Sequence, residues 1–136
     1  MRLLNKQQYI DINSKDAKAM LDYRKYCANL TDYELMSEWS SRVQGVLREY
    51  VKNAEKFTEA KDFLDLLNLA PWIFRDHPLD PLAGKRFQII NSEYDQRLNL
   101  RINNNNTIGG IFGYLKELTE ENIYTTLLAV RGQRNQ

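Results

Sequence analysis

Between Leu35 and Phe57, apolar residues recur at intervals of three and four along an otherwise polar stretch. A period of 3.6 residues places such positions on one face of an α-helix. The sequence therefore predicts a long amphipathic helix whose apolar face packs against other parts of the chain. The residues on this face are Leu35, Trp39, Val43, Val46, Leu47, Tyr50, Ala54 and Phe57.

The limits of this helix are predicted by residues just outside the stripe. Thr31 and Glu34 have the spacing of a capping box, in which each side chain accepts a hydrogen bond from the other residue's backbone N–H. Lys61 stands where the next apolar residue is due, so the stripe loses its phase. We therefore expect a helix over residues 31–57, followed by a break near Thr58 and a second, shorter helix. A continuous helix that is buried on more sides is the alternative.

Turn and capping residues predict further boundaries. Ser, Thr, Asp and Asn side chains accept hydrogen bonds from free N–H groups at helix starts, and the residue before a proline avoids helical geometry. The expected boundaries are a helix start at Asn13 or Ser14, a helix end at Ala70-Pro71, a start at Asp80-Pro81, a loop at Asn103–Asn106, and a final helix capped by Thr119.

The segment 86–102 fits two structures. Helical spacing relates Phe87, Ile90, Tyr94, Leu98 and Ile102. However, Leu98, Leu100 and Ile102 also alternate with polar residues, a pattern that is typical of an amphipathic strand. A small β-hairpin within 86–102 is therefore an alternative, although the preceding Asp-Pro pair favours a helix. Overall we expect a mainly α-helical bundle of four to six helices, forming a single domain over residues 1–136.

Composition narrows the classes of function. The 136 residues include 19 Lys and Arg against 18 Asp and Glu, so the net charge gives no reason to expect an anionic partner. One cysteine, Cys27, and one histidine, His77, exclude an internal disulfide and do not complete a four-ligand zinc site. The chain lacks a signal-peptide pattern and an apolar run of about 20 residues. We expect a cytoplasmic, soluble protein without a cofactor, a metal or a membrane partner.

No arrangement of residues predicts catalysis. Arg75, Asp76 and His77 include an acid–base pair, but adjacent residues rarely point into one site, and no nucleophile motif accompanies them. The glycines of 109–113 lack the lysine and the hydroxyl residue of a phosphate-binding loop. We therefore expect that the protein is not an enzyme.

Basic and aromatic residues between 85 and 106 suggest a nucleic-acid-binding module as the second hypothesis. Aromatic rings can stack on bases while cations neutralise phosphates. Glu93 and Asp95 interrupt this set, and Phe87 and Tyr94 belong to the expected core face. The candidate cations are Lys85, Arg86, Arg97 and Arg101.

Aromatic content favours protein–protein interaction as the leading hypothesis. The chain has eight tyrosines, two tryptophans and five phenylalanines, more than the helical periodicity places in a core. Tyrosine and tryptophan are enriched at interfaces because they combine apolar area with a polar tip. We expect an adaptor, inhibitor or assembly factor that binds another protein or itself. The candidate contact residues are Trp39, Trp72, Tyr33 and Tyr114.

Overall fold

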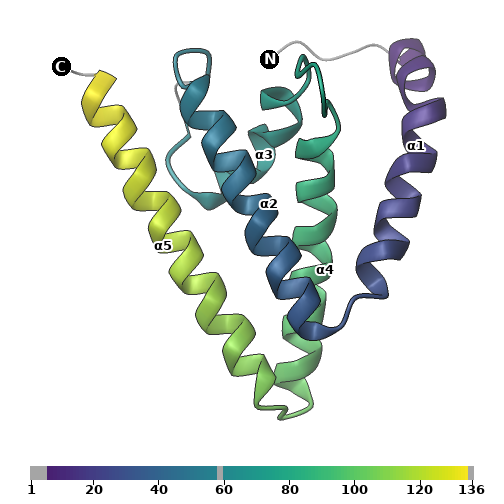
Figure 1. Cartoon of the computed structure of the whole chain (residues 1–136), viewed down its shortest axis with the longest axis vertical. Coiled ribbons are helices and arrows are strands. Elements are labelled where there is room, and N and C mark those ends of the chain that lie inside the picture. The colour runs from purple at the N-terminus through teal and green to yellow at the C-terminus, as the bar shows by residue number, and fades with distance from the viewer. Residues whose placement is uncertain (1–5, 58–59, 135–136) are drawn as a thin grey trace.

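Five α-helices make up the chain in a computed structural model that describes residues 6–57 and 60–134. Figure 1 shows α2 and α4 in the middle, with α1 and α5 on either side and the short α3 packed behind α2. The expected mainly helical bundle is confirmed. The helices are α1 (Lys6–Ala28), α2 (Asp32–Lys52), α3 (Phe63–Ile73), α4 (Ala83–Asn103) and α5 (Ile108–Arg134).

Helix α4 is the centre of the bundle, because it packs against each of the other four helices. Its residues Phe87, Ile90 and Tyr94 are completely buried at helical spacing. The outer helices α1 and α5 diverge from each other toward the end of the bundle where α1 begins and α5 ends (Figure 1). Helix α5 contacts α4 in the first half of α5, where Phe112 meets Tyr94 and Lys116 meets Asp95.

The core is built on aromatic rings. Trp39 of α2 stacks on Tyr94 of α4, with 4.1 Å between ring centroids, and its indole N–H donates to Asn91 Oδ1 at 3.0 Å. Tyr94 in turn packs edge-on against Phe112 of α5 and donates its hydroxyl to the Phe112 carbonyl at 2.7 Å. Phe63 of α3 contacts the Trp39 ring from another side. These contacts join four helices through one cluster of rings.

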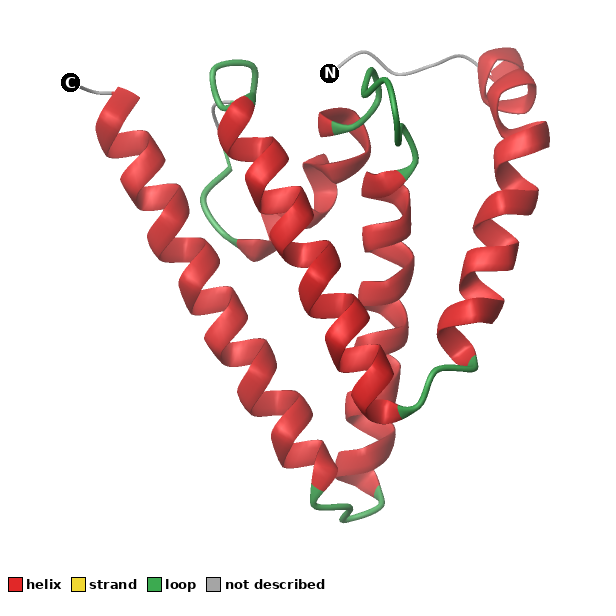
Figure 2. Cartoon of the chain, viewed as in Figure 1, coloured by secondary structure: helices red, strands yellow, loops and turns green. Residues whose placement is uncertain are grey.

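The alternative of a β-hairpin within 86–102 is wrong. This segment lies inside α4, and Figure 2 shows helices and loops but no strand in the described part of the chain. The alternating residues do not follow the burial that a strand requires, since Leu100 and Ile102 are exposed whereas the polar Arg97 is buried. The residues at helical spacing, Phe87, Ile90 and Tyr94, are completely buried, so the segment forms the helix that places them in the core.

The long helix is shorter than the stripe that predicts it. Its capping box is confirmed, with the Glu34 N–H donating to Thr31 Oγ1 and the Thr31 N–H donating to Glu34 Oε1. The helix ends at Lys52, so the expected end at Phe57 is wrong. Phe57 nevertheless packs against the core from the following turn, and its carbonyl accepts a hydrogen bond from Tyr50. A break followed by a shorter helix is confirmed, because α3 begins at Phe63 with Asp62 as its N-cap, and the alternative of one continuous helix is wrong. Thr58 itself lies outside the described residues.

Helix α3 continues through Pro71, so the expected helix end at Ala70-Pro71 is wrong. Proline lacks the N–H that would donate to the carbonyl four residues earlier, which is that of Leu67. The Gln88 side chain of α4 donates to this carbonyl instead, at 2.9 Å. A contact from a distant part of the chain thus compensates for the proline.

Other boundaries also differ from those expected. Helix α1 begins upstream of Asn13. Helix α4 begins at Ala83 without a side-chain cap, since its N-cap residue is Leu82, and the Asp80 carboxylate pairs with Arg86. Helix α5 passes through Thr119, whose hydroxyl donates to the Leu115 carbonyl instead of capping a helix. The loop expected at the asparagine run is confirmed for residues 104–106, which follow the last residue of α4.

Candidate functional site

The four aromatic residues predicted to contact a partner lie in different environments. Trp39 is completely buried, so it belongs to the core and offers no surface. Trp72 of α3 is partly buried. Tyr33 and Tyr114 are 66% and 64% exposed. Only these two tyrosines present most of their surface to solvent.

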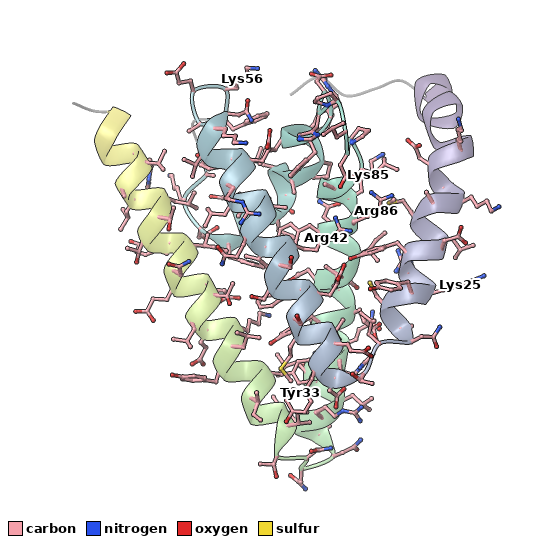
Figure 3. The ribbon with its side chains drawn as sticks, viewed as in Figure 1. Lys25, Tyr33, Arg42, Lys56, Lys85 and Arg86 are labelled. Carbon is pink, nitrogen blue, oxygen red and sulfur yellow. The ribbon has the colours of Figure 1, made fainter. Side chains whose placement is uncertain are left out.

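These residues do not form a single patch. Tyr33 lies in the first turn of α2, at the end of the bundle shown in Figure 3, whereas Trp72 lines a small cavity with Glu49 and Asn53 at the other end of α2. The distance along the helix axis from Tyr33 to Glu49 is about 24 Å. One small interface therefore cannot be centred on both Tyr33 and Trp72.

The basic residues of the nucleic-acid hypothesis are mostly paired with acids. Arg97 contacts Asp32 at 3.0 Å and Glu93 at 2.9 Å, and Arg101 contacts the other Asp32 oxygen at 3.0 Å. Arg86 pairs with Asp80 at 2.8 Å. These ion pairs hold α4 to neighbouring elements and use the charges that would bind phosphates.

Of the other cations labelled in Figure 3, Arg42 and Lys85 lie near Arg86, whereas Lys25 and Lys56 lie apart from them. The Arg42 and Arg86 guanidinium groups both approach the Tyr23 ring on the side of the bundle that faces α1. Arg42 also lies 3.7 Å from Glu38 Oε1 and 3.8 Å from Asp80 Oδ2. Lys85 has no acidic partner among the described residues. Most of the charge of these neighbouring cations is therefore shared with acids.

The Asp32 carboxylate gives a pH-dependent contribution to stability. Burial raises its pKa, but the hydrogen bonds and charges of Arg101 and Arg97 outweigh this effect and lower the pKa below its ordinary value of 3.8. The folded state therefore binds its proton less readily than the unfolded state. The stabilisation is complete above the unfolded pKa and is lost as the pH falls through the folded pKa.

We expect the free energy of unfolding to fall as the pH drops below about 5, and Asp32→Asn to reduce that slope. Urea denaturation followed by circular dichroism at several pH values measures it. Asp22→Asn is the control, since Asp22 is exposed on α1 with no polar partner among the described side chains. Equal acid slopes for Asp32→Asn and the wild-type protein would contradict this assignment.

Within the Arg75, Asp76 and His77 set, the Asp76 carboxylate does not orient the His77 ring, whose Nε2 lies 3.9 Å from Glu49 Oε2. His77 Nδ1 accepts hydrogen bonds from the backbone N–H groups of Leu79 and Asp80, so the ring holds the loop before α4. The Asp76 carboxylate pairs with Arg75 and not with His77. Within residues 6–57 and 60–134, no group of acidic, histidine or cysteine side chains is placed to hold a metal ion.

A groove lies between α3 and α5 on the described surface. It has a volume of about 550 Å³, and the facing turns of α3 and α5 form its walls while α4 lies at its base. We call it the α3–α5 groove. Its lining residues are Asp62, Phe63, Leu64, Leu67, Asn91, Asp95, Lys116, Glu117, Glu120, Glu121 and Tyr124.

Large apolar side chains are accessible on both walls of the α3–α5 groove. Leu64 of α3 is 60% exposed and Tyr124 of α5 is 49% exposed. Leu67 is partly buried and packs against the core, and Phe63, also of α3, is buried with its ring next to that of Trp39. The groove therefore offers an apolar strip that continues into the aromatic core.

The rim of the α3–α5 groove is acidic. Five carboxylates and a single ammonium group line it. Lys116 Nζ lies 2.7 Å from Asp95 Oδ1 and 4.0 Å from Glu120 Oε1, so its charge is shared by two acids. Glu117 and Glu121 are exposed and have no ion pair among the described residues. The unpaired charge therefore lies on α5.

Sequence reasoning missed this groove for a definable reason. Its walls come from segments that are distant in sequence, and no local pattern predicts that α3 and α5 face each other. The spacing of Glu117, Glu121 and Tyr124 marks one face of a helix. A helix that begins at Thr119 excludes Glu117, so the expected boundary separates residues that share one face of α5.

Comparisons do not supply a function. No protein-family model matches the chain, and no curated protein or solved structure matches it. None of the helices in the described ranges combines the length and apolar character needed to cross a membrane.

Proposed function

We propose that this protein is a non-enzymatic protein-binding module that holds a partner chain in the α3–α5 groove. The observation that carries this proposal is the exposure of Leu64 and Tyr124 on opposite walls of one 550 Å³ groove. Exposed apolar side chains of this size cost free energy in water, which a partner chain would recover by covering them.

The make-up of the groove favours a protein partner over a small molecule. Small-molecule sites enclose most of their ligand in a concave, mainly apolar pocket. The α3–α5 groove instead has a Tyr and Leu strip inside a charged rim, which is the arrangement of a protein interface. Its acidic rim would also repel nucleic-acid phosphates, and Arg86, Arg97 and Arg101 are already paired.

The test compares complex formation by wild-type protein with that of groove variants. Leu64→Ser and Tyr124→Ser each remove an exposed apolar side chain, and Leu79→Ser removes one that is 89% exposed outside the groove. We expect wild-type protein and Leu79→Ser to retain a partner from an extract of the source cells. Each groove variant should retain about tenfold less, because aromatic and aliphatic anchors dominate interface energies.

Light scattering and mass spectrometry identify the bound species and its stoichiometry. Circular dichroism confirms that each variant remains folded, which is expected because the replaced side chains are largely exposed. Equal retention by all four proteins, or retention by none of them, would contradict binding through the α3–α5 groove.

A further inference from the structure

We propose that the segment held in the α3–α5 groove is a basic amphipathic helix of another protein. Its apolar side would cover Leu64, Leu67 and Tyr124, and its lysine or arginine side chains would pair with Glu117 and Glu121. The inference rests on the proposed protein-binding function and adds the chemistry of the partner.

Charge is the first argument for a basic partner. The whole chain is nearly neutral, with a formal net charge of +1, whereas the groove carries five carboxylates against one ammonium group. The acidity is therefore local to the groove. Opposite potentials across an interface speed association and exclude wrongly charged partners.

The state of the individual carboxylates supports the same conclusion. Asp62 caps α3 by accepting from the Asp65 N–H, and Asp95 binds Lys116. Glu117 and Glu121, in contrast, have no ion pair within the described chain. They lie four residues apart on α5, so both face the same side of the helix. A partner with cations one helical turn apart would match them.

The walls of the groove favour a helix over an extended segment. Both walls are helices, whose backbone groups are hydrogen-bonded internally, and the described chain presents no strand edge. An extended partner would bury N–H and C=O groups without partners, whereas a helix satisfies its own. The lining of α5 from Glu117 to Tyr124 extends over about 10 Å, which corresponds to two helical turns.

A designed peptide tests this inference without knowledge of the natural partner. The probe is a fluorescein-labelled peptide of leucine and lysine, about 14 residues long, with leucines at helical spacing. A second peptide has glutamate in place of every lysine, and a third has the composition of the first in scrambled order. Fluorescence anisotropy with the full-length protein gives the dissociation constant of each peptide at low and high salt.

We expect the lysine peptide to bind at least about tenfold more tightly than the other two peptides, with an affinity that falls as salt is added. Replacing Glu117 and Glu121 together with glutamine should weaken binding about tenfold, because each exposed ion pair contributes up to about 1 kcal/mol. Tyr124→Ser should weaken it at any salt concentration.

The matched control replaces Asp22 with asparagine and Glu55 with glutamine. Both residues are exposed acids outside the groove, so this double variant loses the same charge and should bind like wild-type protein. Equal loss in the control and groove variants would show a general charge effect and overturn the inference. Tight binding of the glutamate peptide would overturn it as well.

The outcomes also separate this inference from the proposed function. If no basic peptide binds but a cellular partner is retained through Leu64 and Tyr124, the protein-binding function stands and the basic helix is wrong. If light scattering shows that a second copy of this chain occupies the groove, the inference is likewise wrong. If groove variants change neither measurement, both proposals fail.

Discussion

Replacing Trp39 with alanine is expected to lower the free energy of unfolding by about 4 kcal/mol. The ring is completely buried and stacks on Tyr94 at 4.1 Å between centroids. Alanine would leave a cavity between α2 and α4, and it would also remove the indole N–H that donates to Asn91 Oδ1. Urea denaturation followed by circular dichroism measures the loss.

Trp39→Phe separates the ring from its hydrogen bond. Phenylalanine keeps most of the apolar contact but leaves the buried Asn91 carbonyl without its indole donor, which costs about 1–3 kcal/mol. We therefore expect Trp39→Phe to unfold between the wild-type protein and Trp39→Ala. A change below about 1 kcal/mol for Trp39→Ala would contradict the core role and favour the surface role expected from residue type.

Replacing Gly84 with alanine is expected to cost about 3 kcal/mol, at the upper end of the usual range for overpacking. A Cβ atom at this position would overlap the Ala70 carbonyl and lie 2.6 Å from the Pro71 nitrogen. Both neighbours are backbone atoms inside α3, so no side chain can move aside. Helices α3 and α4 would have to separate, and thermal or urea denaturation would report the loss.

Gly45→Ala is the matched control, because Gly45 lies inside α2 and a Cβ atom there meets nothing within 4 Å. Alanine at such a position reduces the entropy of the unfolded chain and favours the helix by about 0.5–1 kcal/mol. We thus expect the same glycine-to-alanine substitution to lower the free energy of unfolding at position 84 and to raise it at position 45. A stabilising Gly84→Ala would contradict the close packing of α3 on α4.

Local patterns predicted the fold class but not all of its boundaries. The stripe of α2 and the Thr31–Glu34 capping box depend on neighbours in sequence, and both have counterparts in the structure. Pro71 shows why other boundaries failed. The helix continues through this residue because Gln88, distant in sequence, satisfies the Leu67 carbonyl. No pattern around Pro71 contains that information.

The candidate site was less predictable because residue type alone does not determine burial. Trp39 and Arg97 are typical of contact surfaces, yet the structure buries Trp39 in the core and pairs Arg97 with Asp32 and Glu93. Tyr94, which stacks on Trp39, and Asp32, which pairs with Arg97, each lie in a different helix from their partner. The α3–α5 groove is likewise formed by segments that only the tertiary structure brings together.

Site-specific photo-cross-linking tests the central claim, binding of a partner protein in the α3–α5 groove, most directly. Benzoylphenylalanine replaces Tyr124 in the groove in one variant and Tyr33, exposed in the first turn of α2, in the other. After irradiation in the source cells, we predict a discrete protein adduct from position 124 and none from position 33. An adduct from position 33 alone, or from neither position, would contradict the claim.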